Sequence, residues 1–150
     1  MKLAEALNLR ADVSKRLSQL SERLTANAKV QEGDSPAEDP AELLGELDRL
    51  TGQLEELISR INLTNSKTMH NGKSLTEMIA AKDTLSLKSS ILRNFLASAS
   101  AKTDRYSNKE IRVVSTVSVR ELQKKSDELS EEIRKLNVKI QELNWSTDLI

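Results

Sequence analysis

Leucine and other aliphatic residues recur three and four positions apart along most of the chain, and this spacing is the strongest constraint on its fold. Such steps place side chains on one face of an α-helix. The stripes lie within residues 3–28, 43–61, 75–99 and 119–143. Because no helix can bury such a stripe alone, the helices must pack against one another. We therefore expect an all-α fold, an elongated antiparallel bundle of four long helices in a single domain, residues 1–150.

Local signals mark where these helices begin and end. The first is expected to run from about Lys2 to Val30, before a polar loop that contains Gly33 and Pro36. Asp39 and Glu42 form a capping box around Pro40, which indicates the start of the second helix. Further capping boxes precede the third and fourth helices, and an Asn-Gly pair predicts a tight turn before the third: Ser74 with Glu77, Ser118 with Glu121, and Asn71-Gly72.

Charge and composition exclude several classes of protein. The 23 Lys and Arg residues balance 23 Asp and Glu residues, whereas nucleic-acid-binding proteins normally carry a basic excess, so we expect no nucleic-acid partner. The chain has no cysteine, which excludes disulfides and thiolate ligands and fits a reducing compartment. The N-terminal residues lack the apolar core of a secretory signal, and no apolar run reaches the roughly 18 residues of a membrane span. These features predict a cytoplasmic protein without a membrane partner.

A short β-like segment, at about residues 110–117, interrupts the helical pattern. Its apolar residues recur at roughly the two-residue period of a strand. A single strand, however, leaves its backbone N–H and C=O groups without hydrogen-bond partners. In one interpretation the segment pairs with its equivalent in a second subunit as a symmetric two-stranded ribbon, which predicts a homo-oligomer. In the other it is an extended connector whose valines plug one end of the bundle. The candidate residues for contact between subunits are Ile111, Arg112, Val113, Val114 and Val117.

Charged residues on or beside the apolar stripes form a candidate polar cluster. Arg10 lies on the first stripe, and Asp83 and Asp127 flank the third and fourth. A charge inside a bundle must be paired, because burying it alone costs several kcal/mol, and Arg10 with Asp83 or Asp127 is a natural pair. Together with Arg60, these residues indicate a ligand or ion site. Alternatively, they are a pairing device that fixes the helix register, or they lie at a stripe edge where the long Arg and Lys side chains extend to solvent.

The sequence offers few groups for catalysis. His70 is the only histidine, so the paired Glu-x-x-His motifs of a di-iron bundle cannot be assembled. The glycines form no phosphate-binding loop. We therefore expect no cofactor, metal or catalytic residue, and favour a protein that is not an enzyme.

Several phrases that together span nearly the whole chain are similar to a bacterial family labelled septicolysin-like. They are "MKLAEALNLRAD", "NAKVQEGDSPAEDPAELLGELD", "LISRINLTNSKT" and the stretch from "RYSNKEIRVVSTVSV" through "IQELNW". The resemblance implies a shared fold, and the family label implies an oxygen-labile, pore-forming cytolysin. Three hypotheses follow. The first is a self-associating helical interaction or structural protein, the second a membrane-active cytolysin-like protein, and the third a small ligand- or ion-binding protein that uses the polar cluster.

Overall fold

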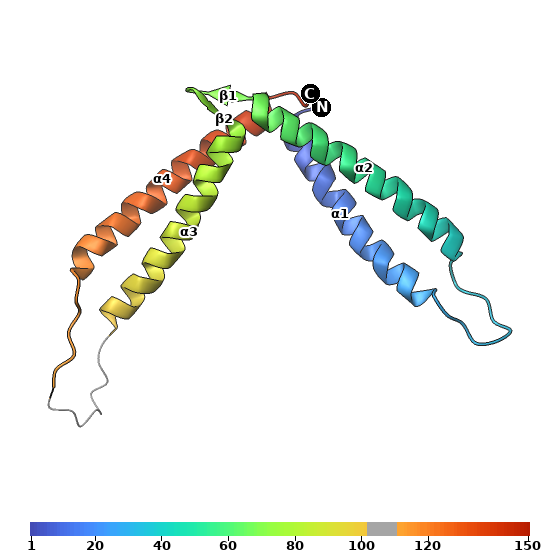
Figure 1. Ribbon diagram of the computed structural model, residues 1–150, viewed down its shortest axis with the longest axis horizontal. Helices are drawn as coiled ribbons and strands as arrows, with labels where there is room; N and C mark the ends of the chain where they lie inside the picture. Colours follow the sequence, from blue (N-terminus) through green and yellow to red (C-terminus); the bar gives the residue numbers. More distant parts are fainter. Residues whose placement is uncertain (102–110) are drawn as a thin grey trace. The chain divides into compact units, whose positions relative to one another are not determined.

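The computed structural model describes residues 1–101 and 111–150 and has an all-α fold, as the stripes predict (Figure 1). Four long helices account for most of the chain. A two-stranded hairpin, β1 (Met69–His70) and β2 (Lys73–Ser74), lies between the second and third of them. The helices are α1 (Leu3–Ala26), α2 (Pro40–Lys67), α3 (Leu75–Ser100) and α4 (Val119–Ser146).

The chain divides into two compact units. The first contains residues 1–75 and 141–150, and the second contains residues 76–140. Helices α1 and α2 form an antiparallel pair in the first unit, and α3 and α4 form one in the second (Figure 1). That the whole chain forms a single domain, as its length predicts, stays a prediction.

The core of the first unit is aliphatic and lies between α1 and α2. The stripes predicted from spacing supply it, because leucines three and four apart on each helix face the partner helix. Leu20 and Leu50 are completely buried. Other buried members of this core are Leu3, Val13, Leu43, Leu57 and Ile61.

The predicted start of α2 is confirmed. Pro40 is its first residue, and an Asp39 carboxylate oxygen accepts a hydrogen bond from the Ala41 amide at 2.9 Å. Helix α1 ends at Ala26, earlier than expected. Asn27 explains this early end, because its side-chain amide donates to the Arg23 carbonyl while its side-chain oxygen accepts from the Glu38 amide, both at 2.9 Å. The side chain of Asn27 thus caps α1 and holds the following loop.

The Asn71-Gly72 turn is also confirmed. Asn71 has φ 48° and Gly72 has φ 79°, in the left-handed region that these residues tolerate best. The turn joins β1 to β2 in an antiparallel register that pairs Met69 with Ser74 and His70 with Lys73. The two short strands themselves were not expected from the sequence.

The C-terminal residues contact the N-terminal residues and α2, which belong to the same unit. The Leu3 amide donates to the Thr147 carbonyl and the Leu149 amide to the Met1 carbonyl, both at 2.9 Å. The Lys2 ammonium lies 2.8 Å from an Asp148 carboxylate oxygen, and this contact lowers the pKa of Asp148. We call residues 147–150 the C-terminal clasp.

Candidate functional site

Helix α3 carries two separate apolar stripes. The first, which we call the inner stripe, has steps of three and four and is buried or half-buried along its length. Two open grooves between α3 and α4 are lined by inner-stripe residues together with α4 residues, among them Ser89 with Ile133 and Leu92 with Leu129. The inner stripe therefore faces α4. Its members are Met78, Lys82, Leu85, Ser89, Leu92, Leu96 and Ala99.

The second stripe of α3, which we call the outer stripe, is exposed. Leu87 is 63% exposed, Ile91 61% and Phe95 47%. With 3.6 residues per turn, the five positions fall within about 80° of one another on the helix and lie roughly 140° away from the inner stripe. A helix that is apolar on two sides normally has a second packing partner. The outer stripe consists of Thr84, Leu87, Ile91, Phe95 and Ser98.

A groove of about 430 Å³ runs along the outer stripe. Leu87, Ile91 and Phe95 line it, together with Leu92 and the stems of Thr84 and Lys88. Lys88 is the only charged residue among them. Because an exposed apolar surface of this kind commonly marks a contact site, the groove is the strongest candidate for function in the described part of the chain.

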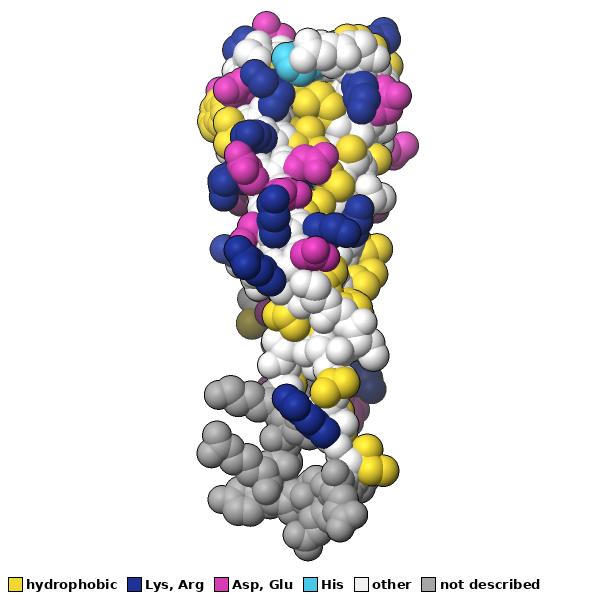
Figure 2. All heavy atoms as spheres, turned by 90° about the vertical axis from the view of Figure 1, so that its left-hand side faces the viewer, with side chains coloured by type: hydrophobic (Ala, Val, Ile, Leu, Met, Phe, Trp, Pro, Cys, Tyr) yellow, Lys and Arg dark blue, Asp and Glu magenta, His cyan; other side chains and the backbone are white. Residues whose placement is uncertain are grey.

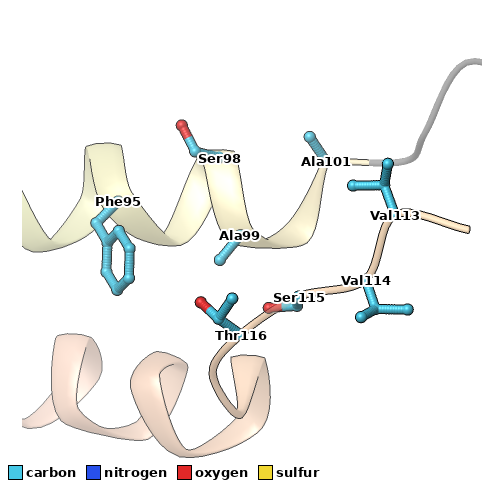
Figure 3. A pocket seen from close by; sticks show the side chains of 8 residues that line it. All are labelled: Phe95, Ser98, Ala99, Ala101, Val113, Val114, Ser115 and Thr116. Carbon is cyan, nitrogen blue, oxygen red and sulfur yellow. The ribbon is translucent and has the colours of Figure 1, made fainter.

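Phe95 connects this groove to a second hollow, also of about 430 Å³, beside the segment that precedes α4. Figure 3 shows Phe95 and Ala99 directed from α3 toward Thr116, with Val113 and Val114 beyond the end of the helix. Val113 and Val114 are each 65% exposed. The outer stripe and these two valines thus form one apolar surface, which we call the α3 surface.

The described part of the predicted β-like segment, residues 111–117, is not in a strand of this chain, and residue 110 lies outside the described residues. Within the described chain, its backbone makes no hydrogen bond to another segment's backbone. The side chains of Ile111, Arg112, Val113 and Val114 are exposed and only Val117 is half-buried, so the first two valines do not plug a bundle end. Pairing with a second subunit stays a prediction.

The face of α4 differs from the α3 surface. Figure 2 looks at the side of the molecule on which α4 lies and shows Lys and Arg interspersed with Asp and Glu, with hydrophobic side chains between them and at the margins. On α4 itself, Lys135 lies 2.8 Å from Glu131 one turn earlier, and this contact lowers the pKa of Glu131. Such mixed-charge surfaces are well solvated and need no partner.

The four residues of the predicted polar cluster belong to different units, and Arg60, Asp83 and Asp127 have contacts within their own unit. Arg60 donates from Nε to the Ile150 carbonyl at 2.9 Å, and Asp83 lies 3.6 Å from the Lys82 ammonium. Asp127 accepts a hydrogen bond from Gln123 at 3.0 Å. Asp83 and Asp127 are exposed, and Arg10 is half-buried. Binding of a ligand or ion by these residues stays a prediction.

Comparison with known proteins assigns the chain to a family. The model of a family of unknown function, DUF6847, matches residues 10–149. The chain belongs to this family. It is also similar to a solved structure described as the crystal structure of a functionally unknown conserved protein from Corynebacterium diphtheriae. That structure shares 43% sequence identity and a TM-score of 0.93 with the chain, over 100% of this chain and 99% of the other. No curated protein matches the chain.

These comparisons correct the septicolysin-like assignment, which was wrong. The phrases that suggested it belong to a chain of the DUF6847 family, and neither the family description nor that of the neighbour mentions a cytolysin. Short phrases from helical proteins are rich in Leu, Glu and Lys, so they resemble many unrelated sequences. No helix among the described residues of this DUF6847 chain is long and apolar enough to cross a membrane.

The outer stripe was missed by the sequence analysis, although a signal for it exists. Phe95 lies next to an inner-stripe residue in the sequence, and the spacing of the apolar residues therefore assigned it to the same buried face. Leu87 and Ile91, one turn apart, lie on a different side of the helix from the inner stripe, so the spacing itself carries the signal for a second apolar face. The described residues of this DUF6847 chain contain no group of three or more potential metal-ligating side chains.

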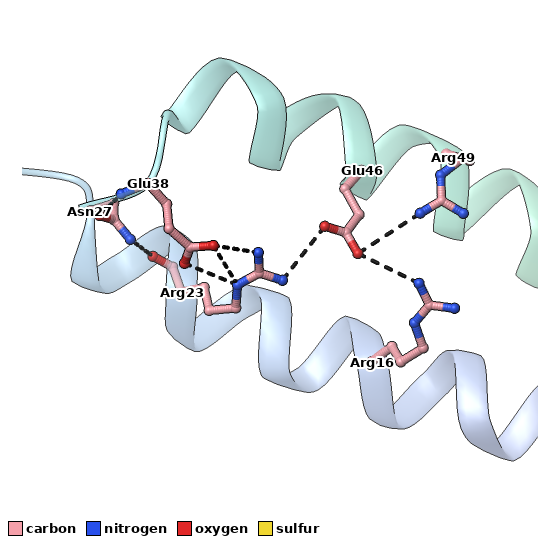
Figure 4. Close-up of polar contacts among 6 residues, drawn as sticks. All are labelled: Arg16, Arg23, Asn27, Glu38, Glu46 and Arg49. Atoms are coloured by element: carbon pink, nitrogen blue, oxygen red, sulfur yellow. Dashed lines mark hydrogen bonds and ion pairs between the residues drawn. The ribbon is translucent and has the colours of Figure 1, made fainter. Parts of the chain in front are cut away.

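A polar network joins α1, α2 and the loop between them in the first unit (Figure 4). Arg23 donates three hydrogen bonds to the Glu38 carboxylate, two of them from Nε at 3.0 and 3.2 Å, and lies 3.5 Å from Glu46. Glu46 in turn lies 3.6 Å from Arg16 and 3.8 Å from Arg49. Hydrogen bonding to Glu38 raises the pKa of Arg23, and the same contact lowers the pKa of Glu38. The network holds the loop against α1.

The network predicts a loss of stability in acid. Because the pKa of Glu38 is lower in the folded chain than in the unfolded one, its contribution is complete above the ordinary glutamate pKa of 4.5 and is lost as the pH falls through the folded value. We expect Glu38→Gln to reduce the difference in urea midpoint between neutral pH and pH values below about 4. Glu55→Gln, an exposed change on α2, is the control. Equal acid sensitivity in wild type and Glu38→Gln would contradict the role of this contact.

Proposed function

We propose that the chain is a helical interaction protein that self-associates through the α3 surface. The observation that carries this proposal is the exposed outer stripe, with Leu87 and Ile91 more than 60% exposed on a helix whose other apolar face is buried or half-buried. The proposal assigns no catalytic step to the chain. Its partner is a second copy, so the chain forms a homo-oligomer.

The size of the surface supports association at moderate affinity. Complete burial of a Val, Leu, Ile or Phe side chain contributes about 1.5–3 kcal/mol, and the five large side chains of the α3 surface are about half to two-thirds exposed. Two copies bring ten such side chains together, for roughly 8–18 kcal/mol in total. Association costs about 4–15 kcal/mol. The two ranges overlap, so we expect an oligomer that dissociates on dilution.

The charges of α3 support a second copy as the partner. From Thr84 to Ser100 the helix carries Lys88 and Arg93 and no acidic residue. A strongly acidic or basic partner would need a complementary cluster of charge, which this stretch lacks. A surface that is mainly apolar, with small polar residues at its ends, can pack against a copy of itself, since homodimer interfaces are more apolar than other interfaces.

Light scattering coupled to size-exclusion chromatography tests the proposal. Ile91→Glu places a charge at the centre of the outer stripe and is expected to shift the protein from oligomer to monomer at micromolar concentration, because an interface buries such a charge unpaired. Val138→Glu is the matched control, since Val138 is 52% exposed on α4 and lies outside the α3 surface. Circular dichroism confirms that both variants remain helical. A wild-type protein that is strictly monomeric over the accessible concentrations refutes the proposal.

A further inference from the structure

The outer stripe has a spacing that is the same in both directions along the helix. Its positions are separated by three, four, four and three residues, with Ile91 at the centre. The large side chains Leu87 and Phe95 flank the centre, and the small polar side chains Thr84 and Ser98 lie at the ends. A two-fold interface brings the same patch of both subunits together, so a stripe that matches its own reversal is suited to it.

We infer that α3 pairs with α3 of a second copy in an antiparallel register centred on Ile91. This inference rests on the proposed self-association and specifies its geometry. In this register Ile91 faces the partner's Ile91, Leu87 faces the partner's Phe95, and Thr84 faces the partner's Ser98. Each large side chain then meets a large one and each small polar side chain meets a small polar one, which keeps the packing even along the interface.

The charges on α3 favour the antiparallel register over a parallel one. Parallel helices in the same register place Lys88 beside the partner's Lys88, and like charges that face each other across an interface are unfavourable. The antiparallel register places Lys88 opposite the partner's Asn94. At 1.5 Å per residue, it also separates the two Lys88 positions by about 9 Å along the helix axis.

The antiparallel register also gives the segment before α4 a binding site. Val113 and Val114 share a hollow with Ala99 and Ala101 at the end of α3, about 12 Å along the axis from Ile91 at 1.5 Å per residue. Reversal of the partner helix brings this end beside the partner's Thr84, which faces Ser98 in this register. The two valines of one copy therefore cover the Thr84 end of the groove on the other.

This arrangement differs from the symmetric ribbon expected from the sequence. The two valine segments lie at opposite ends of the paired helices, about 24 Å apart along the axis at 1.5 Å per residue. At that distance they cannot share backbone hydrogen bonds. Each segment instead packs its side chains on the partner's α3, and the ribbon becomes the result expected for a parallel register.

The natural absence of cysteine allows a clean test by disulfide cross-linking. Single cysteines are introduced at exposed positions of the full chain, and the proteins are oxidised with copper phenanthroline at micromolar concentration. A disulfide requires Cα atoms within about 7 Å. We expect Ile91→Cys to cross-link to itself. We expect Leu87→Cys and Phe95→Cys to cross-link poorly alone but efficiently when mixed, and Val113→Cys to cross-link to Thr84→Cys.

The outcomes separate this inference from the proposed function. Efficient self-cross-linking of Leu87→Cys and of Val113→Cys indicates a parallel register and overturns the inference while leaving self-association intact. An oligomeric protein in which no outer-stripe cysteine cross-links faster than Val138→Cys, the control on α4, also overturns it. A wild-type chain that is monomeric by light scattering removes the proposed function itself, and the antiparallel register with it.

Discussion

Replacing Leu50 with alanine is expected to lower the free energy of unfolding by about 2–5 kcal/mol. Leu50 is completely buried on α2, in the aliphatic core between α1 and α2. Truncation removes favourable burial and leaves a cavity that the two rigid helices can only partly fill. Urea denaturation followed by circular dichroism measures the effect.

The same helix provides the control for this prediction. Leu44→Ala makes the same chemical change at a position that is 52% exposed, and exposed substitutions usually change stability by less than about 0.5 kcal/mol. A similar loss of stability in both variants would mean that α1 and α2 do not pack through the predicted stripes. The loss of stability would then reflect an effect of the substitution on α2 as a whole.

Replacing Thr64 with valine is expected to release the C-terminal clasp. Thr64 is completely buried, and its hydroxyl donates to the Arg60 carbonyl at 2.8 Å while accepting from the Ile150 amide at 3.0 Å. Valine has nearly the same shape but cannot accept a hydrogen bond, so the Ile150 amide loses its partner. Ile150 is 49% exposed, so the loss is that of one partly buried hydrogen bond, about 0.5–1.5 kcal/mol.

Amide hydrogen exchange gives the direct measurement for this second prediction. We expect exchange at Leu149 and Ile150 to accelerate in Thr64→Val, because the clasp opens more often. Thr64→Ser keeps the hydroxyl while losing a methyl group, so it should retain the protection of these amides. Unchanged protection in the valine variant would show that the contacts of Met1, Lys2 and Leu3 hold the clasp without Thr64.

Local features of the fold could be predicted from the sequence because they depend on neighbouring residues. Steps of three and four fix helical faces, Asp39 with Pro40 fixes a helix start, and Asn71-Gly72 fixes a turn. The end of α1 was harder, because Asn27 ends the helix together with Glu38, which lies eleven residues further along the chain. Spacing alone does not reveal such a pair.

The candidate site could be predicted only in part, for a related reason. Periodicity shows that a face is apolar but not whether another helix covers it, so Phe95 was assigned to the buried stripe of α3 and the exposed Leu87 and Ile91 were missed. The valines at 113 and 114 were recognised as unusual, and the structure places them beside the end of α3. Arg60 was expected in a charged cluster, whereas its guanidinium donates to the Ile150 carbonyl ninety residues away. Contacts at such separations leave no local pattern in the sequence.

The C-terminal clasp has a consequence for the order of events during biosynthesis. Residues 141–150 belong to the same compact unit as residues 1–75. A ribosome must therefore make residues 76–140 before the missing piece of that unit emerges, a delay of several seconds at about 5–20 residues per second. During this delay Thr64 and the Leu3 amide lack their final partners. The first unit thus remains incomplete until residues 141–150 have been made.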